Sequence, residues 1–198
     1  MTANPARDGR PQAVVLVEGL SDRLALEVLA RRRGRDLAAD GVTVIAMGGA
    51  TNLGRYLERY GPGGLNVKLA GLCDAAEEEY FGRALRRAGI GAGASGAGAS
   101  GTAMEALGFF VCTLDLEDEL IRAVGTDAVE RIIEAQGELR SLRTLQRQPA
   151  QRGRPAPDQL RRFMSGRSGN KHRYARLLAD AVDLNQVPPP LDGVLARV

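Results

Sequence analysis

Three short apolar runs in this chain each end at an acidic residue. The runs and the acids that follow them are 13–17 with Glu18, 67–73 with Asp74, and 109–114 with Asp115. Short apolar runs bounded by turn or helix signals are typical of buried strands in a parallel sheet. Ligands of such sheets bind outside the carboxyl ends of the strands, and a carboxylate placed there is costly unless something pairs with it. The pattern therefore predicts a metal site at one edge of a sheet.

Helical segments alternate with the predicted strands. We expect strands at 13–17, 42–47, 67–73 and 108–113, with helices at 21–33, 51–60, 75–88 and 116–124. Ser21 is a good N-cap for the first helix, and the Gly-Pro-Gly-Gly segment after Tyr60 stops the second. This βαβαβαβ order indicates an α/β fold: a four-stranded parallel sheet with right-handed crossovers, flanked by helices.

Further segments complete the predicted domain organisation. Residues 91–103, within a first domain at 11–125, contain a repeated Gly/Ala/Ser pentapeptide and are expected to form a flexible loop. Residues 126–184 are expected to form a helical basic extension. Its helices are expected at 127–145, 158–165 and 171–181, with a disordered or extended linker at 146–157. The last segment, 185–198, is proline-rich and is expected to be a polyproline-like tail.

The composition fits a compact cytoplasmic protein. Hydrophobic residues make up 44% of the 198 residues, which is enough for a core. No apolar stretch approaches the roughly 20 residues that cross a bilayer, and the first residues lack the apolar segment of a signal peptide, so no membrane contact is expected. Cys73 and Cys112 lie within predicted strands, so we expect core residues rather than a disulfide or a zinc pair.

Positive charge is concentrated in one segment of a chain whose net charge is only +3. Residues 140–176 are rich in arginine and contain Asp158 as their only acid. Acids grouped for metal and bases grouped for phosphate suit an enzyme that acts on nucleic acid. Alternatively, the arginines only cover solvated surfaces, and the sequence leaves both interpretations open. The candidates for phosphate binding in this segment are Arg161, Arg162 and Arg173.

Several motifs resemble one known family. The sequence V-E-G-L-S-D at 17–22 follows an apolar strand, like the first motif of the Toprim domain of topoisomerases, primases and several nucleases. The EGxSD form, the RLALEVLA helix, a GGATNL segment and LDLEDEL are most similar to the Toprim domain of the overcoming-lysogenization-defect (OLD) family of nucleases. The resemblance covers about 13–125 and, more weakly, the helical extension.

The resemblance implies a set of acidic site residues. Glu18 corresponds to the Toprim glutamate, which binds metal or acts in acid–base chemistry, and Asp22 is the second acid of the ExxxD pattern. Asp74 corresponds to the first aspartate of a DxD motif, and Asp115 and Glu117 correspond to the acidic pair after the fourth strand. Taken alone, Asp22 also suits a helix N-terminus, and Asp115 an N-cap.

The sequence departs from the family at one position. The second aspartate of the DxD motif would fall at position 76, which is Ala76 here. Glu77 follows immediately and is a candidate replacement ligand. On a helix, however, its side chain would point about 100° away from that of residue 76 around the helix axis. The acids offer hard oxygen ligands, and no cluster of His and Cys is available for zinc. We therefore expect Mg²⁺ or Mn²⁺, with one tight and one weak site.

Two further features concern the phosphate. The resemblance matches Lys171 with a terminal lysine of the family's helical tail, and its ammonium would stabilise charge on the transition-state oxygens. A solvated lysine is the alternative. Gly48 and Gly49 follow the second strand, where their amides would contact a phosphate or simply form a turn.

These features predict an Mg²⁺- or Mn²⁺-dependent endonuclease that cleaves phosphodiester bonds in DNA or RNA, with Glu18, Asp74 and Lys171 in catalytic roles. DNA is the expected partner, and because aromatic residues are few, contacts would be chiefly with phosphate. The alternative, which Ala76 favours, is a non-catalytic Toprim module that binds nucleic acid or a separate ATPase chain. A separate ATPase is a candidate partner because the P-loop motif GxxxxGK[ST], expected in the ATPase half of full-length OLD nucleases, does not occur in this sequence.

Overall fold

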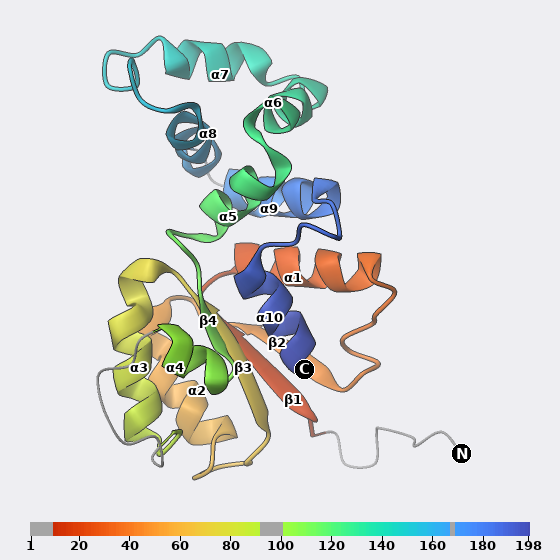
Figure 1. Ribbon diagram of the computed structural model, residues 1–198, viewed down its shortest axis with the longest axis vertical. Helices are drawn as coiled ribbons and strands as arrows, with labels where there is room; N and C mark the ends of the chain where they lie inside the picture. Colours follow the sequence, from red (N-terminus) through yellow and green to blue (C-terminus); the bar gives the residue numbers. More distant parts are fainter. Residues whose placement is uncertain (1–9, 92–100, 167–168) are drawn as a thin grey trace.

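The predicted strands form one parallel sheet. The computed structural model describes residues 10–91, 101–166 and 169–198. Its strands are β1 (Ala13–Val17), β2 (Val42–Ala46), β3 (Lys68–Cys73) and β4 (Phe109–Val111). They lie in the order β2-β1-β3-β4, and every neighbouring pair is parallel (Figure 1). The predicted α/β fold with a four-stranded parallel sheet flanked by helices is confirmed.

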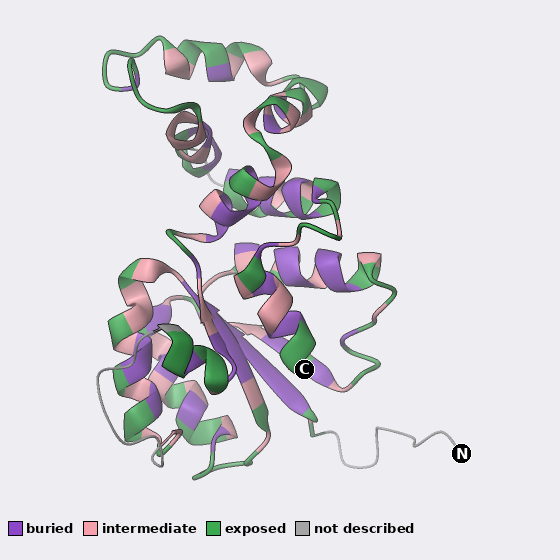
Figure 2. Ribbon diagram, viewed as in Figure 1, coloured by how far each residue is buried: buried purple, intermediate pink, exposed green. Residues whose placement is uncertain are grey.

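Helices cover both faces of the sheet because β1 is apolar on both sides. Its residues alternate between two core clusters: Val14 and Leu16 belong to one, and Ala13, Val15 and Val17 to the other. One face is covered by α2 (Leu53–Tyr60), α3 (Glu78–Arg87) and α4 (Gly101–Ala106). The other is covered by α1 (Leu20–Arg32) and helices of the C-terminal half. Figure 2 shows the buried strands between these layers.

Two short 3₁₀ turns lead from strands into helices. They are η1 (Ala50–Asn52), which precedes α2, and η2 (Ala75–Glu77), which precedes α3. Both therefore lie beyond the carboxyl ends of strands, at the edge of the sheet where the sequence predicts a site.

The C-terminal half is helical, as expected, and it packs on the sheet domain. Its helices are α5 (Leu116–Val124), α6 (Thr126–Ala135), α7 (Leu139–Gln146), α8 (Ala156–Ser165) and α9 (Asn170–Ala181). The single helix expected at 127–145 is two helices, which part at Gly137, where φ is +72°. In Figure 1, α6, α7 and α8 form one end of the molecule, while α9 lies along α1. Tyr174 and Leu178 on α9 are fully buried in the core that α1 shares.

The proline-rich end is a helix, which corrects the expectation of a polyproline-like tail. α10 spans Pro189–Arg197, with Pro188 as its N-cap. Prolines are tolerated in the first helical turn, since no intrahelical bond needs their missing N–H groups. Leu191, Val194 and Leu195 are buried against the sheet, so this segment completes the core.

Two connecting segments also differ from expectation. Most of the predicted flexible loop, 92–100, lies outside the described residues, but 101–103 begin α4. The predicted linker at 146–157 forms turns, and Gln151 within it is only 7% exposed. The carbonyl of Gln151 accepts a hydrogen bond from Nε2 of Gln159 at 2.8 Å, so α8 holds the linker in place.

Both cysteines are core residues, as predicted. Cys73 belongs to the core cluster on the α2 and α3 side, and Cys112 to the cluster on the α1 side. Burial raises the pKa of both thiols well above the usual value, so both stay protonated. Within the described part of the chain, no helix has the length and apolar character needed to cross a membrane.

Candidate active site

Glu18 lies at the meeting point of three strand ends. It follows β1 directly, and its Oε1 accepts a hydrogen bond of 3.0 Å from the backbone N–H of Asp74, the first residue after β3. Its carbonyl oxygen accepts bonds of 3.0 Å from the N–H groups of Gly48 and Gly49, just after β2. The amides of Gly48 and Gly49 therefore fix the backbone of Glu18. The expectation that they contact a phosphate is not supported.

Asp22 lies in the first turn of α1 and faces the same edge. Its Oδ2 accepts a hydrogen bond of 2.8 Å from the N–H of Gly19, which satisfies a free donor at the helix N-terminus. Burial, with smaller contributions from Glu117 and Glu18, raises the pKa of Asp22 to about 6. The residue thus combines the capping role with a place in the acidic cluster.

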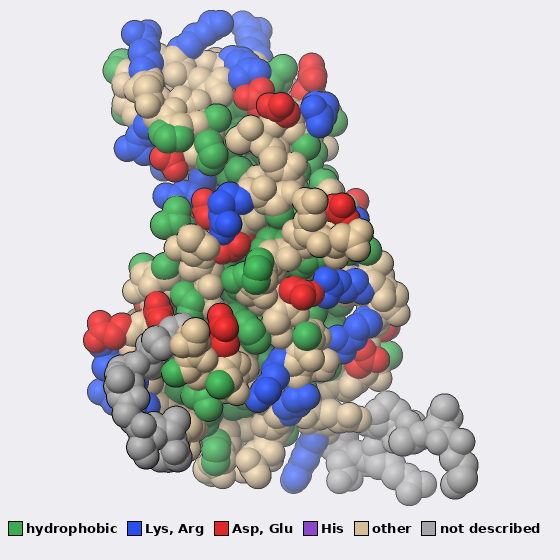
Figure 3. Space-filling view, in the orientation of Figure 1, with side chains coloured by type: hydrophobic (Ala, Val, Ile, Leu, Met, Phe, Trp, Pro, Cys, Tyr) green, Lys and Arg blue, Asp and Glu red, His purple; other side chains and the backbone are tan. Residues whose placement is uncertain are grey.

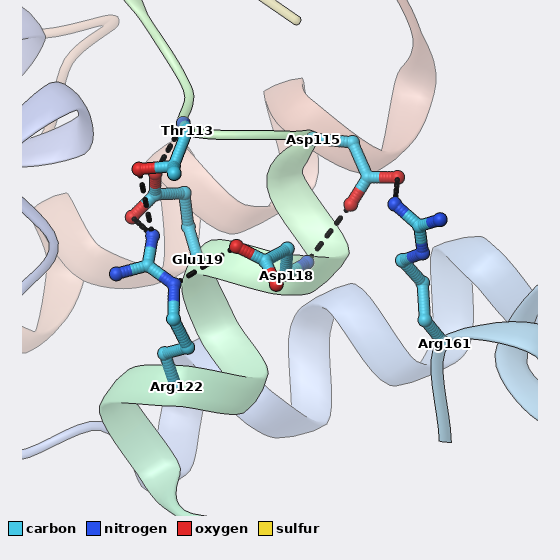
Figure 4. A network of polar contacts seen from close by, with 6 residues as sticks. All are labelled: Thr113, Asp115, Asp118, Glu119, Arg122 and Arg161. Atoms are coloured by element: carbon cyan, nitrogen blue, oxygen red, sulfur yellow. Dashed lines mark hydrogen bonds and ion pairs between the residues drawn. The ribbon is translucent and has the colours of Figure 1, made fainter. Parts of the chain in front are cut away.

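Asp115 binds two partners after β4. Its Oδ1 accepts a hydrogen bond of 2.9 Å from the N–H of Asp118, which caps α5. Its Oδ2 forms an ion pair of 3.1 Å with the guanidinium of Arg161 on α8. Figure 4 shows that the two contacts approach Asp115 from different elements. The side chain of Asp115 therefore caps α5 and, through its ion pair with Arg161, connects the edge of the sheet to α8.

Glu119 is a buried acid that the sequence analysis did not single out. Its side chain is 2% exposed, and its Oε1 accepts a bond of 2.7 Å from the N–H of Thr113. Arg122 pairs with its other oxygen at 2.7 Å and also donates to the hydroxyl of Thr113 (Figure 4). These bonds fix the segment between β4 and α5, and so the direction of Asp115. The acidic run LEDE was the only available signal.

Glu117, like Glu119, is almost completely buried, with its side chain 4% exposed. Its Oε2 forms an ion pair of 3.0 Å with Nζ of Lys171, at the start of α9. Its Oε1 is buried without a hydrogen-bond partner among the described residues. A buried carboxylate oxygen without a partner is costly, so this atom is suited to a ligand that brings positive charge.

The acids are close enough to change one another's protonation. Burial, followed by repulsion from Glu18, Asp22, Asp115 and Glu117, raises the pKa of Asp74 to about 7. Burial also raises the pKa of Glu18, although the bond from the amide of Asp74 and the charge of Lys171 oppose the rise. Burial is the largest cause of both shifts, and repulsion between the carboxylates adds to it.

The same carboxylates also raise the pKa of Lys171, and for a lysine this favours the charged form. Burial lowers its pKa, but the carboxylates of Glu117, Asp115 and Asp74 outweigh this effect, and the pKa is raised overall. Lys171 therefore remains a cation directed at the acids, although it is half-exposed at the start of α9.

The position of the missing DxD acid is exposed. Ala76 lies in η2 with its side chain exposed to solvent. Glu77 lies nearer the cluster, because its charge contributes to the raised pKa of Glu18. Its N–H donates to the carbonyl of Asp74 at 3.0 Å, which fixes the turn. Of the two positions, Glu77 is the one placed to supply a further oxygen ligand.

The three arginines predicted to bind phosphate lie in different places. Only Arg161 reaches the acidic cluster. Arg162 is exposed on the same helix. Arg173 is bound to Glu138, the residue before α7, and lies over the ring of Tyr174, 4.9 Å from its centroid, so its guanidinium already has partners within the protein. A phosphate contact at Arg173, whose side chain is 39% exposed, stays a prediction.

The donor set suits a hard divalent cation. In the segments that the structure describes, no three His, Cys, Asp or Glu side chains are grouped tightly enough to hold a metal ion as they stand. The carboxylates nevertheless converge from several elements, and Oε1 of Glu117, which has no hydrogen-bond partner among the described residues, fits the ligand set of such a cation. The five residues that fit such an ion are Glu18, Asp22, Asp74, Asp115 and Glu117.

Comparison with known proteins identifies part of the chain. Residues 12–75 match the family described as "Overcoming lysogenization defect protein-like, TOPRIM domain". This range contains β1 to β3 and the acids Glu18, Asp22 and Asp74. No curated protein matches the chain significantly.

Solved structures of similar fold are C-terminal regions of OLD proteins. That of the Xanthomonas campestris pv. campestris OLD protein has a TM-score of 0.72 and 24% identity, covering 95% of this chain and 92% of that one. A second structure of the same region has 26% identity and a TM-score of 0.68, covering 94% of each chain. The region from the Burkholderia pseudomallei OLD protein has 20% identity and a TM-score of 0.68, with 94% and 96% covered. The predicted resemblance is confirmed, and the shared fold includes the helical extension.

Proposed function

We propose that this chain, which carries a Toprim domain similar to those of OLD proteins, is a divalent-metal-dependent nuclease that cleaves phosphodiester bonds. A domain of this kind supports a function related to nucleic acid. One observation favours chemistry over binding alone: the buried Oε1 of Glu117 has no partner in the described residues, among acids that converge from the ends of β1, β3 and β4. A cluster of acids that is only partly neutralised by Lys171 and Arg161 is costly to keep on a surface that only binds a polyanion.

Glu18, Asp22, Asp74, Asp115 and Glu117 would hold the cation, which we propose to be Mg²⁺ or Mn²⁺ at one tight and one weak site. Carboxylate oxygens are the ligands these ions prefer. When bound, such ions activate a water molecule and neutralise charge on the phosphate. The hydrogen bond between Glu18 and Asp74 holds two of the ligands in place before any ion arrives.

Lys171 would act directly on the phosphate. Its raised pKa keeps it charged, and its ion pair with Glu117 holds the ammonium at the cluster. We propose that this ammonium stabilises the charge that develops on the non-bridging oxygens in the transition state. Arg161, held by Asp115, is a second cation at the same edge.

The nucleic acid, which we propose to be DNA, would be held by the helical extension. Exposed arginines lie on α7 and on the turns that follow it, among them Arg140, Arg147, Arg152 and Arg154. Figure 3 shows basic side chains gathered at this end of the molecule. Phosphate contacts of this kind are independent of sequence, so we expect little base specificity.

A plasmid-nicking assay with Mn²⁺ tests the proposal. The Glu18→Gln variant keeps an oxygen that can accept the bond from Asp74 but lacks the charge, so it should fold and lose most of its cleavage. The matched control is Glu79→Gln, an exposed acid on α3 whose side chain is 85% exposed. Equal nicking by the wild type and Glu18→Gln, or none by the wild type under conditions where it binds DNA, would contradict the proposal.

A non-catalytic module that binds nucleic acid or a separate ATPase chain is the second candidate. Ala76 favours it, since an exposed alanine stands where the family's pattern has an acid. This candidate predicts DNA binding, or binding to an ATPase, without cleavage in either Mn²⁺ or Mg²⁺.

A further inference from the structure

We infer that Arg161 is an internal counter-ion of the metal site, which a divalent cation displaces from Asp115 and which then binds a phosphate of the nucleic acid. The inference rests on the proposed function and concerns the regulation of that site. Arg161 would thereby link metal binding to substrate binding.

The first argument is the geometry of the ion pair. The guanidinium of Arg161 lies 3.1 Å from Oδ2 of Asp115, while Oδ1 of Asp115 is already used to cap α5. Oδ2 is therefore the oxygen that Asp115 has left for a cation, and Arg161 occupies it (Figure 4). A metal ion bound at this atom would lie close to the positive charge of Arg161, so the two cations oppose each other there.

Second, the helix α8, which carries Arg161, is anchored in the core by its apolar side chains. The residue before Arg161, Leu160, is fully buried, and Phe163 and Met164 also pack in the core. The backbone at Arg161 is thus fixed, whereas its side chain is 37% exposed. A long, partly solvated side chain on a rigid helix can exchange one partner for another without moving the fold.

The third argument is the difference between the two basic residues of the site. Lys171 pairs with Glu117, which is almost fully buried, whereas Arg161 pairs with Asp115, whose side chain is 21% exposed. Although Lys171 is itself the more exposed cation (46% against 37%), the carboxylate of Asp115 is more accessible to water than that of Glu117, so less is lost when Arg161 leaves its acid. Its planar guanidinium also matches two oxygens of a phosphate, which an ammonium cannot do.

The charges at this edge explain why Arg161 would leave Asp115 for a phosphate only after a divalent cation has bound. Five carboxylates face Lys171 and Arg161 at this edge, so without a metal ion the site repels a polyanion and holds Arg161. With a divalent cation bound, the carboxylates no longer need Arg161, and its guanidinium is free for the substrate. Metal and nucleic acid then favour each other's binding, and this coupling is reciprocal.

Calorimetry with Mn²⁺ alone gives the first test. Arg161→Met keeps the length of the side chain and removes its charge, so Mn²⁺ should bind about threefold to fivefold more tightly than to the wild type. Arg86→Met, at an exposed arginine in the last turn of α3, is the control and should bind Mn²⁺ with wild-type affinity. Circular dichroism checks that both variants are folded.

Binding of a short DNA duplex, measured by fluorescence anisotropy with and without Ca²⁺, gives the second test. Ca²⁺ also prefers oxygen ligands. It should strengthen DNA binding by the wild type and by Arg86→Met, whereas in Arg161→Met this gain should fall by at least about threefold, which is the loss of coupling.

The outcomes separate the inference from the proposed function. Unchanged Mn²⁺ affinity in Arg161→Met, or an unchanged gain from Ca²⁺, overturns the inference and leaves the nuclease proposal intact. A wild type that binds no divalent cation overturns both.

Discussion

The side chain of Glu18 accepts a hydrogen bond from the backbone amide of Asp74, so the first residue after β1 is held against the first residue after β3. The two residues are 56 positions apart, and the contact exists because β1 and β3 are parallel neighbours in register. One carboxylate is thereby fixed next to another, and the repulsion between them must be offset by protons, by Lys171, or by a cation.

The stability of the metal-free protein should fall as pH rises through the pKa values of this cluster. Asp74 has a pKa of about 7 and Asp22 of about 6, against 3.8 for an ordinary aspartate, so the folded state binds more protons than the unfolded chain. Their contribution is therefore greatest below about pH 4 and is lost between about pH 4 and pH 7. Urea unfolding at several pH values should show Asp74→Asn more stable than the wild type at pH 8, and no such advantage at pH 4.

Mn²⁺ should restore the stability that the wild type lacks at pH 8. A ligand that binds only the folded state adds about 2.7 kcal/mol when present at a hundred times its Kd. The Tm of the wild type should therefore rise in Mn²⁺, and that of Asp74→Asn should rise less. A wild-type Tm at pH 8 that ignores millimolar Mn²⁺ would contradict a cation at this site.

Ala76→Asp should strengthen the weaker of the two proposed metal sites. The substitution supplies the acid that the DxD pattern would have, at an exposed position where an added carboxylate meets no packing obstacle. Activity in Mg²⁺ should rise towards that in Mn²⁺, because Mg²⁺ demands more nearly complete octahedral coordination. Calorimetry should show the weaker site tightening. If neither quantity changes, Glu77→Gln tests whether Glu77 already supplies the ligand.

Lys171→Ala should lower cleavage by about a hundredfold while DNA binding changes little, since the ammonium is proposed to act on the transition state. It should also leave the buried carboxylate of Glu117 without its counter-ion, which costs about 1 kcal/mol for a pair whose lysine is half-exposed. Arg176→Ala, an exposed site on the same helix, is the control for general charge loss. Cleavage at the wild-type rate would show that Lys171 is a structural partner of Glu117 only.

DNA affinity should depend on salt through the arginines of α7 and the turns after it. Replacing Arg140, Arg147 and Arg152 by Gln should reduce the slope of log K against log salt by about one for each phosphate contact removed. Substitution is preferable to truncation after 137, because α9 lies beyond that point and packs on α1 through buried Tyr174 and Leu178. An unchanged slope would show that these arginines are exposed to solvent but make no contact with the phosphates.

The sequence predicted the parts of this structure that depend on local pattern. The apolar runs placed β1, β3 and β4, and because parallel strands end at one edge, Glu18, Asp74 and Asp115 could be expected to meet. The buried cysteines followed from the same strands. Those predictions needed only the positions of the apolar runs and the parallel direction of the strands.

Other features depended on contacts that no local pattern contains. Arg161, Arg162 and Arg173 look alike in the sequence, but only Arg161 is directed at the acids, because the packing of α8 on α5 decides which side of the helix faces the site. Glu119 is buried because Thr113 and Arg122 surround it. The prolines of the last segment suggest an extended chain, but the segment forms the helix α10, because its apolar residues pack against the sheet.

The packing of α10 gives a prediction in which two effects oppose each other. Replacing a helical glycine by alanine normally stabilises a helix by about 0.5–1 kcal/mol. At Gly193 in α10, an added Cβ would collide with the ring of Phe110 on β4, so Gly193→Ala should destabilise the protein, by about 1–3 kcal/mol. Gly54 in α2 is the matched control: nothing lies within 4 Å of its added Cβ, so Gly54→Ala should be neutral or stabilising. Urea unfolding of both variants decides the matter, and a stabilising Gly193→Ala would mean that α10 does not pack closely on β4.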